Sequence, residues 1–398
     1  MTSNDHSLDN PDLTPWDENC ASRYRDLGFW RGVPLDDIVS RGAVLFKDNI
    51  AIFSSKRSWT YGVLNQKVNE LAAGFIKLGI RADEKVVVQL PNIGEFLEVV
   101  FALFRIGAVP VYTLPAHRYM EIESFCRLTD ASAYIVADRV ARFDYRELAR
   151  KLLPSTSLKH VIIVGDAQEF TALDQLYQQP IACSPRKSSS IALLQLSGGT
   201  TNVPKLIPRT HDDYYYSVRE SAKICCLNEA SIYMAALPVA HNFPHSSPGV
   251  LGTLYAGGSV VMAESPAPDL AFDLIEKYAV TITALVPSLA MVWMAAGKNA
   301  HQELSSLQVI QVGGAKFGSE SAKKLVSVFN CKLQQVFGMA EGLVNYTRLD
   351  DPDEITFYTQ GRPISEADEI RIVDTEDNDL ANGQVGELLT RGPYTIRG

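Results

Sequence analysis

A loop of small and hydroxyl-bearing residues carries the strongest chemical signal in this 398-residue sequence. Glycines let main-chain N–H groups converge on an anion, hydroxyl groups add donors, and a lysine adds positive charge. The sequence lacks both the P-loop pattern G-x-x-x-x-G-K-S/T and the dinucleotide pattern G-x-G-x-x-G. The loop therefore predicts a phosphate-binding site of another kind, with an ordinary surface turn as the alternative. It follows the largely apolar run Ile191–Leu196 and contains Ser197, Gly198, Gly199, Thr200, Thr201 and Lys205.

This loop and three later segments resemble the adenylate-forming superfamily, which contains acyl-CoA synthetases, luciferases and peptide-synthetase adenylation domains. The loop is similar to the superfamily's signature, and residues 335–342, Gln-Val-Phe-Gly-Met-Ala-Glu-Gly, are similar to its adenine and metal segment. Residues 240–249 and 312–316 are most similar to the 2,3-dihydroxybenzoate-AMP ligases of catechol siderophore synthesis. The resemblance runs from about Trp30 to the last residue, and several motifs in the right order make it specific.

The resemblance implies a reaction in which a carboxylate attacks ATP to give an acyl adenylate and pyrophosphate, with ATP and Mg²⁺ as cofactors. Lys205, His241 and Glu341 are the implied catalytic residues, and Glu341 is the expected oxygen ligand of Mg²⁺. Because a carboxylic acid is already ionised at neutral pH, His241 is expected to line the substrate rather than to act as a base. The alternatives are a structural histidine and a solvated carboxylate. The implied ATP-binding residues are Ser197, Gly198, Gly199, Thr200, Thr201, Lys205, Gly314, Ala315, Val336, Phe337, Gly338, Met339 and Ala340.

The expected substrate is an aryl acid, and the resemblance names 2,3-dihydroxybenzoate. Asn242 stands where amino-acid-activating relatives have an Asp that pairs with the substrate ammonium, and a neutral amide suits an acid without an amine. Ser247 and Val344 match the positions beside the 3-hydroxyl, which favours the catechol acid over salicylate. Phe243 replaces a tyrosine common in relatives, and His245 has no assigned role. The implied substrate-binding residues are His241, Asn242, Phe243, Ser247, Gly313, Lys316 and Val344.

Composition excludes several other classes of protein. A formal charge of −9 and a pI near 5.4 argue against general nucleic-acid or anionic-membrane binding. The amino-terminal residues lack the features of a signal peptide, and no apolar stretch approaches the roughly 18 residues of a membrane span. Six cysteines are scattered without C-x-x-C pairs, which indicates reduced thiols and a cytoplasmic location.

Alternating apolar runs and helical patterns predict an α/β fold with two α/β lobes. Each lobe is expected to hold a largely parallel sheet flanked by helices in a layered sandwich, followed by an incomplete β-rich third subdomain. Helical spacing is expected over residues 64–78 and 95–106, and Tyr214, Tyr215 and Tyr216 are expected to pack rather than to stack on a ligand. The expected divisions are residues 1–30 as an N-terminal extension, 31–187 and 188–365 as the lobes, and 366–398 as the start of the β-rich subdomain.

One departure from the family concerns the end of the sequence. Relatives continue with a ribose-binding Asp, a hinge and a C-terminal lid domain carrying a catalytic Lys, none of which is present in these 398 residues. The expectation is therefore substrate binding with little or no turnover by this chain alone. A full-length parent is expected to pass the aryl group to the phosphopantetheine thiol of an aryl carrier protein. The alternatives are an aryl-CoA ligase and a non-catalytic aryl-acid or nucleotide-binding module.

Overall fold

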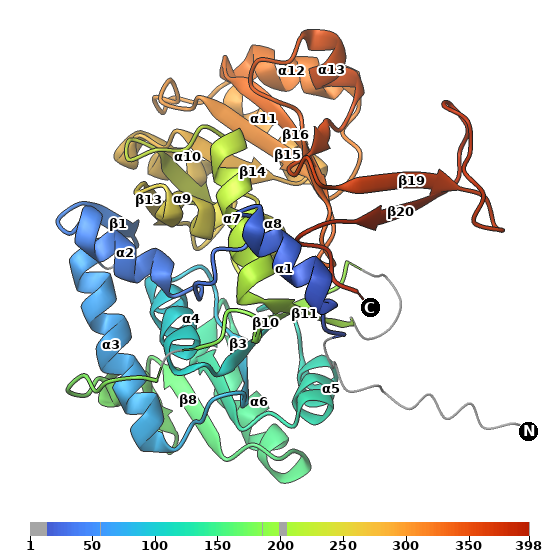
Figure 1. Cartoon of the computed structure of the whole chain (residues 1–398). Helices are drawn as coiled ribbons and strands as arrows, with labels where there is room; N and C mark the ends of the chain where they lie inside the picture. Colours follow the sequence, from blue (N-terminus) through green and yellow to red (C-terminus); the bar gives the residue numbers. More distant parts are fainter. Residues whose placement is uncertain (1–13, 56, 185, 199–204, 398) are drawn as a thin grey trace, which may run out of the picture.

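A computed structural model describes residues 14–55, 57–184, 186–198 and 205–397. Two large sheets with helices between and outside them make up most of these residues (Figure 1). In the described part of the chain, no helix has the length and apolar character needed to cross a membrane.

The first sheet has seven strands in the described residues, in the order β11-β10-β4-β3-β5-β8-β9. All neighbouring strands are parallel except β10 and β11. The central strands are buried along almost their whole length, as expected for a parallel sheet covered on both faces. The strands are β3 (Lys85–Gln89), β4 (Val109–Tyr112), β5 (Ala133–Ala137), β8 (His160–Val164), β9 (Thr171–Ala172), β10 (Ile191–Leu196) and β11 (Leu206–Thr210).

The second sheet has nine strands in the same described residues, in the order β18-β17-β16-β15-β14-β12-β13-β1-β2. Its strands from β16 to β1 are parallel, whereas β17, β18 and β2 pair antiparallel at the two edges. The strands are β1 (Ile50–Phe53), β2 (Ser58–Thr60), β12 (Ile232–Ala235), β13 (Ser259–Met262), β14 (Ile282–Leu285), β15 (Val309–Gly313), β16 (Lys332–Gly338), β17 (Val344–Tyr346) and β18 (Arg362–Pro363).

Helices form three further layers around the two sheets. The largest apolar core lies between the sheets and includes side chains from α3, α4, α7 and α9, while two smaller cores cover their outer faces. The helices are α1 (Glu18–Asp26), α2 (Asp37–Leu45), α3 (Tyr61–Leu78), α4 (Gly94–Ile106), α5 (Tyr119–Thr129), α6 (Tyr145–Leu152), α7 (His211–Ile224), α8 (Asn242–Ser246), α9 (Gly249–Tyr255), α10 (Pro268–Tyr278), α11 (Pro287–Gly297), α12 (Ser319–Phe329) and α13 (Asp353–Tyr358). The predicted layered α/β architecture is confirmed.

Helix α3 illustrates how the local sequence fixes these elements. The Thr60 side chain accepts a hydrogen bond from the Val63 N–H and caps the helix, and Gly79 ends it in the left-handed region at φ 106°. Buried Leu64, Val68 and Leu71 recur at helical spacing between the two caps. The apolar face of α3 packs against α4 and α2.

The sheets exchange strands across the predicted lobe boundary. Strands β1 and β2 precede the first sheet in sequence but pair at the edge of the second, and β10 and β11 follow residue 187 but belong to the first. The predicted domain bounds stay a prediction, because membership of a sheet does not by itself divide a chain into domains.

The described ends of the chain lie against each other. Trp30 Nε1 donates to the Pro393 carbonyl at 2.8 Å, and the Arg397 guanidinium lies 3.5 Å from the Asp17 carboxylate.

Beyond the sheets, β19 (Glu369–Val373) and β20 (Glu387–Arg391) form an antiparallel pair that extends away from the body (Figure 1). This pair is the β-rich piece expected after residue 366.

Candidate functional site

A cavity of about 350 Å³ lies at the carboxyl ends of strands from both sheets. Strand β10 of the first sheet ends beside it, and so do β15 and β16 of the second, together with the segment that follows β12. Ligands of parallel α/β sheets bind at this end, because the loops that follow the strands meet there. The cavity is lined by Leu196, Gly198, His241, Asn242, Phe243, Ser247, Gly314, Val336, Gly338, Met339, Ala340 and Val344.

Every lining residue except Leu196 was predicted from the sequence as a site residue. These predicted residues come from segments as far apart in the chain as Gly198 and Val344, which are separated by 146 positions. The predicted residues Gly199, Thr200 and Thr201 lie outside the described part of the chain. The remaining predicted residues flank the lining rather than contribute to it, and they are Ser197, Lys205, Gly313, Ala315, Lys316, Phe337 and Glu341. The structure thus places predicted ATP-binding residues and predicted substrate-binding residues around one cavity. The role of each residue stays a prediction.

One side of the cavity is built on the short helix α8. His241 is its N-cap and faces solvent at the cavity, where partial desolvation lowers the pKa of its imidazole. Phe243 and Ser247 are buried in the wall, and Gly249 begins α9 at φ 52°, close to the Pro244 carbonyl. A Cβ at residue 249 would lie 2.2 Å from that oxygen, so only glycine permits the close approach of the two helices.

The opposite side of the cavity holds the base of the glycine-rich loop. Ser197 N donates to the Lys205 carbonyl at 2.8 Å, and Lys205 N donates to Ser197 Oγ at 3.0 Å. These two bonds bring the ends of the loop together beside Gly198 in the lining. The Lys205 side chain is exposed.

A third segment, residues 338–342, closes the cavity and is fixed through its main chain. Arg209 Nη1 donates to the Ala340 carbonyl at 2.8 Å, and Ile396 N donates to the Glu341 carbonyl at 2.8 Å. The Glu341 side chain is half-buried and makes no hydrogen bond or ion pair to any residue that the structure describes. Its carboxylate therefore remains available to a ligand.

Arg209 is itself almost completely buried at 1% exposure. Its charge is compensated by Asp213, whose Oδ1 accepts from Arg209 Nε at 2.7 Å, and its remaining donors bind the Ala340 and Tyr394 carbonyls. Asp213 also accepts from Thr210 N at 2.6 Å, which forms the capping box of α7. A buried ion pair with all its partners in place specifies one arrangement of the segments that it joins.

Behind the side of the cavity formed by α8, buried aromatic residues surround His245. Its Nε2 lies 3.0 Å from the Tyr112 hydroxyl, and burial lowers the pKa of His245 to about 3, so the ring stays neutral. Tyr214 lies on the other side and donates from its hydroxyl to Asn242 Oδ1 at 2.9 Å. The expectation that the three tyrosines pack is confirmed, since Tyr214, Tyr215 and Tyr216 are each no more than 4% exposed.

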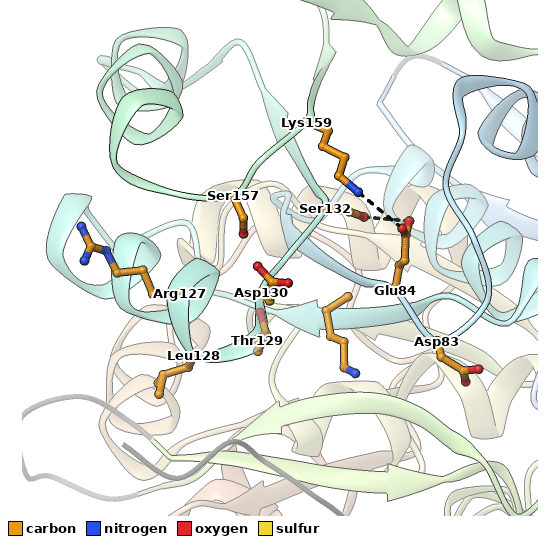
Figure 2. A pocket seen from close by; sticks show the side chains of 10 residues that line it. Asp83, Glu84, Arg127, Leu128, Thr129, Asp130, Ser132, Ser157 and Lys159 are labelled. Carbon is orange, nitrogen blue, oxygen red and sulfur yellow. Dashed lines mark hydrogen bonds and ion pairs between the residues drawn. The ribbon is translucent and has the colours of Figure 1, made fainter. Parts of the chain in front are cut away.

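A larger cavity, of about 630 Å³, lies at the opposite end of the first sheet. It opens beside the amino ends of β3, β5 and β8 (Figure 2). Two of its charged side chains form an ion pair, Lys159 Nζ with Glu84 Oε1 at 3.9 Å, and Ser132 Oγ donates to Glu84 at 3.1 Å. The lining holds three acidic and three basic side chains, which are Asp83, Glu84, Asp130, Lys85, Arg127 and Lys159.

Comparison with known proteins defines the class of this chain. The sequence profile of the family described as AMP-binding enzyme matches residues 39–398. The chain belongs to this family and is an ATP-dependent ligase of the adenylate-forming kind.

Two relatives and one solved structure show which members of the family this chain is similar to. The chain is 56% identical over 389 residues to the 2,3-dihydroxybenzoate-AMP ligase of Bacillus subtilis (strain 168), a match covering 97% of this chain and 72% of the relative. It is 42% identical over 395 residues to the salicyl-AMP ligase / salicyl-S-ArCP synthetase of Mycobacterium tuberculosis, covering 97% and 70%. The solved apo structure of Mycobacterium smegmatis MbtA has a TM-score of 0.92 and 44% identity, covering 97% of this chain and 72% of that one.

Sequence reasoning missed the residues that support the site from behind. Leu196 was assigned only to a strand, and Arg209, Tyr214, Ser246 and Tyr394 received no role in the site. Each is buried, and their contacts join positions far apart in the chain, such as Arg209 to Tyr394. A single sequence holds no signal for such pairings.

Proposed function

We propose that this chain activates 2,3-dihydroxybenzoate with ATP and that the aryl group is then passed to the phosphopantetheine thiol of an aryl carrier protein in catechol siderophore synthesis. The observation that carries the proposal is the shared cavity. Asn242, Ser247 and Val344 line it together with Gly198 and Gly314. The substrates named for the two curated relatives, a catechol acid and salicylate, agree with an aryl acid in this position.

In the proposed first step, a carboxylate oxygen bonds to the α-phosphorus of ATP while the bond to the β-phosphate breaks and pyrophosphate leaves. In the second, the thiol loses its proton to solvent and its sulfur bonds to the acyl carbon, while the bond between that carbon and the phosphate oxygen breaks and AMP leaves. The acid needs no base, because it is already ionised, so catalysis rests on positioning and on charge neutralisation. We assign the β- and γ-phosphates to Ser197, Gly198 and Lys205 and the carboxylate and α-phosphate to His241.

A magnesium ion fits the carboxylate of Glu341. In the described residues no group of three His, Cys, Asp or Glu side chains could hold a metal ion by itself. Mg²⁺ commonly binds one or two carboxylates together with substrate phosphates and water, so a single available carboxylate is the donor set that it uses. When bound, the ion would neutralise phosphate charge, and Glu341 would hold it.

Calorimetric titration and ATP–pyrophosphate exchange test the proposal. The expected result is saturable binding of 2,3-dihydroxybenzoate about tenfold to hundredfold tighter than salicylate, from a Ser247 contact that salicylate lacks. Tighter binding of salicylate, or binding of amino acids in preference to aryl acids, would contradict it. The exchange assay also measures turnover by these 398 residues, whose expected impairment stays a prediction. Thioester formation with carrier protein and with free coenzyme A then separates the two thiol acceptors.

A further inference from the structure

The side-chain amide of Asn242 is held from behind by two hydroxyl groups. Tyr214 Oη lies 2.9 Å from Asn242 Oδ1, and Ser246 Oγ lies 3.1 Å from the same oxygen. The Tyr214 hydroxyl also accepts from Gln195 Nε2 at 3.2 Å, and it donates its single proton to Asn242. Both bonds therefore engage the carbonyl end of the amide.

Tyr214 is fixed in place by its own surroundings. Its side chain is fully buried on α7, and its ring lies 4.9 Å from the guanidinium carbon of Arg209. Arg209 is anchored by Asp213 and by two main-chain carbonyls. Burial raises the pKa of Tyr214 to about 12, so the hydroxyl keeps its proton at neutral pH.

Asn242 lines the cavity, and its carbonyl oxygen is already occupied by donors on the protein side. The other end of the amide, Nδ2, can only donate. An amide without a fixed partner can turn over and present either a donor or an acceptor. The direction of this one side chain thus decides which group of an aryl acid it can meet.

We propose that Tyr214 is a positioning residue that locks Asn242 with its N–H donors toward the substrate, so that the site selects acids carrying an oxygen acceptor beside the carboxylate. This inference rests on the proposed function and deepens it. An acid with an ortho hydroxyl or phenolate gains a hydrogen bond from Asn242, whereas an ortho amine offers mainly donors and gains none. Selection against 2-aminobenzoate then comes from the direction of an amide and not from the size of the cavity.

The Tyr214→Phe variant tests this, because it keeps the ring on Arg209 and removes only the hydroxyl. Dissociation constants for salicylate, benzoate and 2-aminobenzoate are measured by calorimetry for the variant and the unaltered chain. We expect salicylate to bind about threefold to tenfold more weakly, the cost of one lost neutral hydrogen bond, while benzoate is unchanged. The preference for salicylate over 2-aminobenzoate should fall by at least the same factor.

Tyr215→Phe is the matched control, since Tyr215 is the neighbouring buried tyrosine and donates to Asp37 at 2.9 Å, away from the cavity. Its three dissociation constants should stay unchanged. If Tyr214→Phe weakens all three acids equally, or leaves the salicylate-to-benzoate ratio unaltered, the positioning role is wrong although aryl-acid activation stands. If the unaltered chain binds none of the three acids, the proposed function fails, and this inference fails with it. Ser246→Ala, which removes the second donor, should shift the same ratio in the same direction.

Discussion

The two cavities lie at opposite ends of parallel strands, and they differ in the residues that line them and in the sheets that form them. The cavity beside Glu84 and Lys159 is larger, but its charges compensate one another and all its strands come from one sheet. The cavity beside Asn242 combines an apolar wall with main-chain groups, and loops from both sheets form it. Volume alone would therefore favour the cavity beside Glu84, whereas the direction of the strands and the apolar wall favour the cavity beside Asn242 as the ligand site.

The largest expected effect on activity comes from a substitution at the cavity beside Asn242, which lies at the carboxyl ends of the strands. Glu341→Gln removes the proposed Mg²⁺ ligand while it keeps the size of the side chain, and we expect the residual rate of pyrophosphate exchange by this chain to fall by about 10²–10³-fold. Exchange kinetics at several Mg²⁺ concentrations measure this. Glu354→Gln on α13 is the control, because that side chain is exposed and does not line the cavity. Equal rates for Glu341→Gln and the unaltered chain would remove Glu341 from the site.

A smaller and more selective effect is expected at the wall of the same cavity. Ser247→Ala should weaken 2,3-dihydroxybenzoate by about 1–3 kcal/mol, since the 3-hydroxyl would lose its partner. Salicylate lacks that hydroxyl and serves as the internal control, with unchanged affinity. Calorimetry with both acids gives the ratio, and parallel weakening of both would indicate a general change in the wall.

The stability of the folded chain is expected to depend on pH through Asp368, which lies behind this wall. Tyr394 donates to Asp368 Oδ2 at 2.6 Å and accepts from Val344 N at 3.2 Å, and burial raises the pKa of Asp368 to about 6. A raised carboxyl pKa means that the folded state binds more protons than the unfolded state between about pH 4 and pH 6. The contribution of Asp368 to stability is therefore present at low pH and is lost as the pH rises through this window.

Asp368→Asn imitates the protonated carboxyl group and tests whether stability falls as the pH rises. The variant should be more stable than the unaltered chain by about 1–3 kcal/mol above pH 6, and the gain should vanish near pH 4. Thermal unfolding of both proteins across this range measures the difference. A gain that does not change with pH would show that Asp368 does not titrate as inferred.

The smallest effects are expected at the amino-end cavity. Lys159→Ala breaks an ion pair whose lysine is 67% exposed, so we expect a loss of less than about 1 kcal/mol in stability and no change in exchange rate. Denaturant unfolding and the exchange assay measure both. A loss of activity comparable with that of Glu341→Gln would overturn the comparison between the two cavities.

The sequence predicted most of the fold because its apolar patterns are local. The helix expected over residues 95–106 is α4 (Gly94–Ile106), and the first helix expected, over residues 64–78, ends with α3 at Leu78. Strands β1 and β2 were not predicted, since they have four and three residues and form through pairing with the distant β13 and with each other. The lining of the site was predicted from motif resemblance, whereas the contact of Tyr214 with Asn242 depends on tertiary packing.

The meeting of the two chain ends has a practical consequence for protein engineering. Trp30 binds the Pro393 carbonyl, and the next residue, Tyr394, reaches Val344 in the wall of the cavity. Removing the stretch that carries Trp30 as a dispensable leader would thus withdraw a hydrogen bond that holds the segment in contact with Val344.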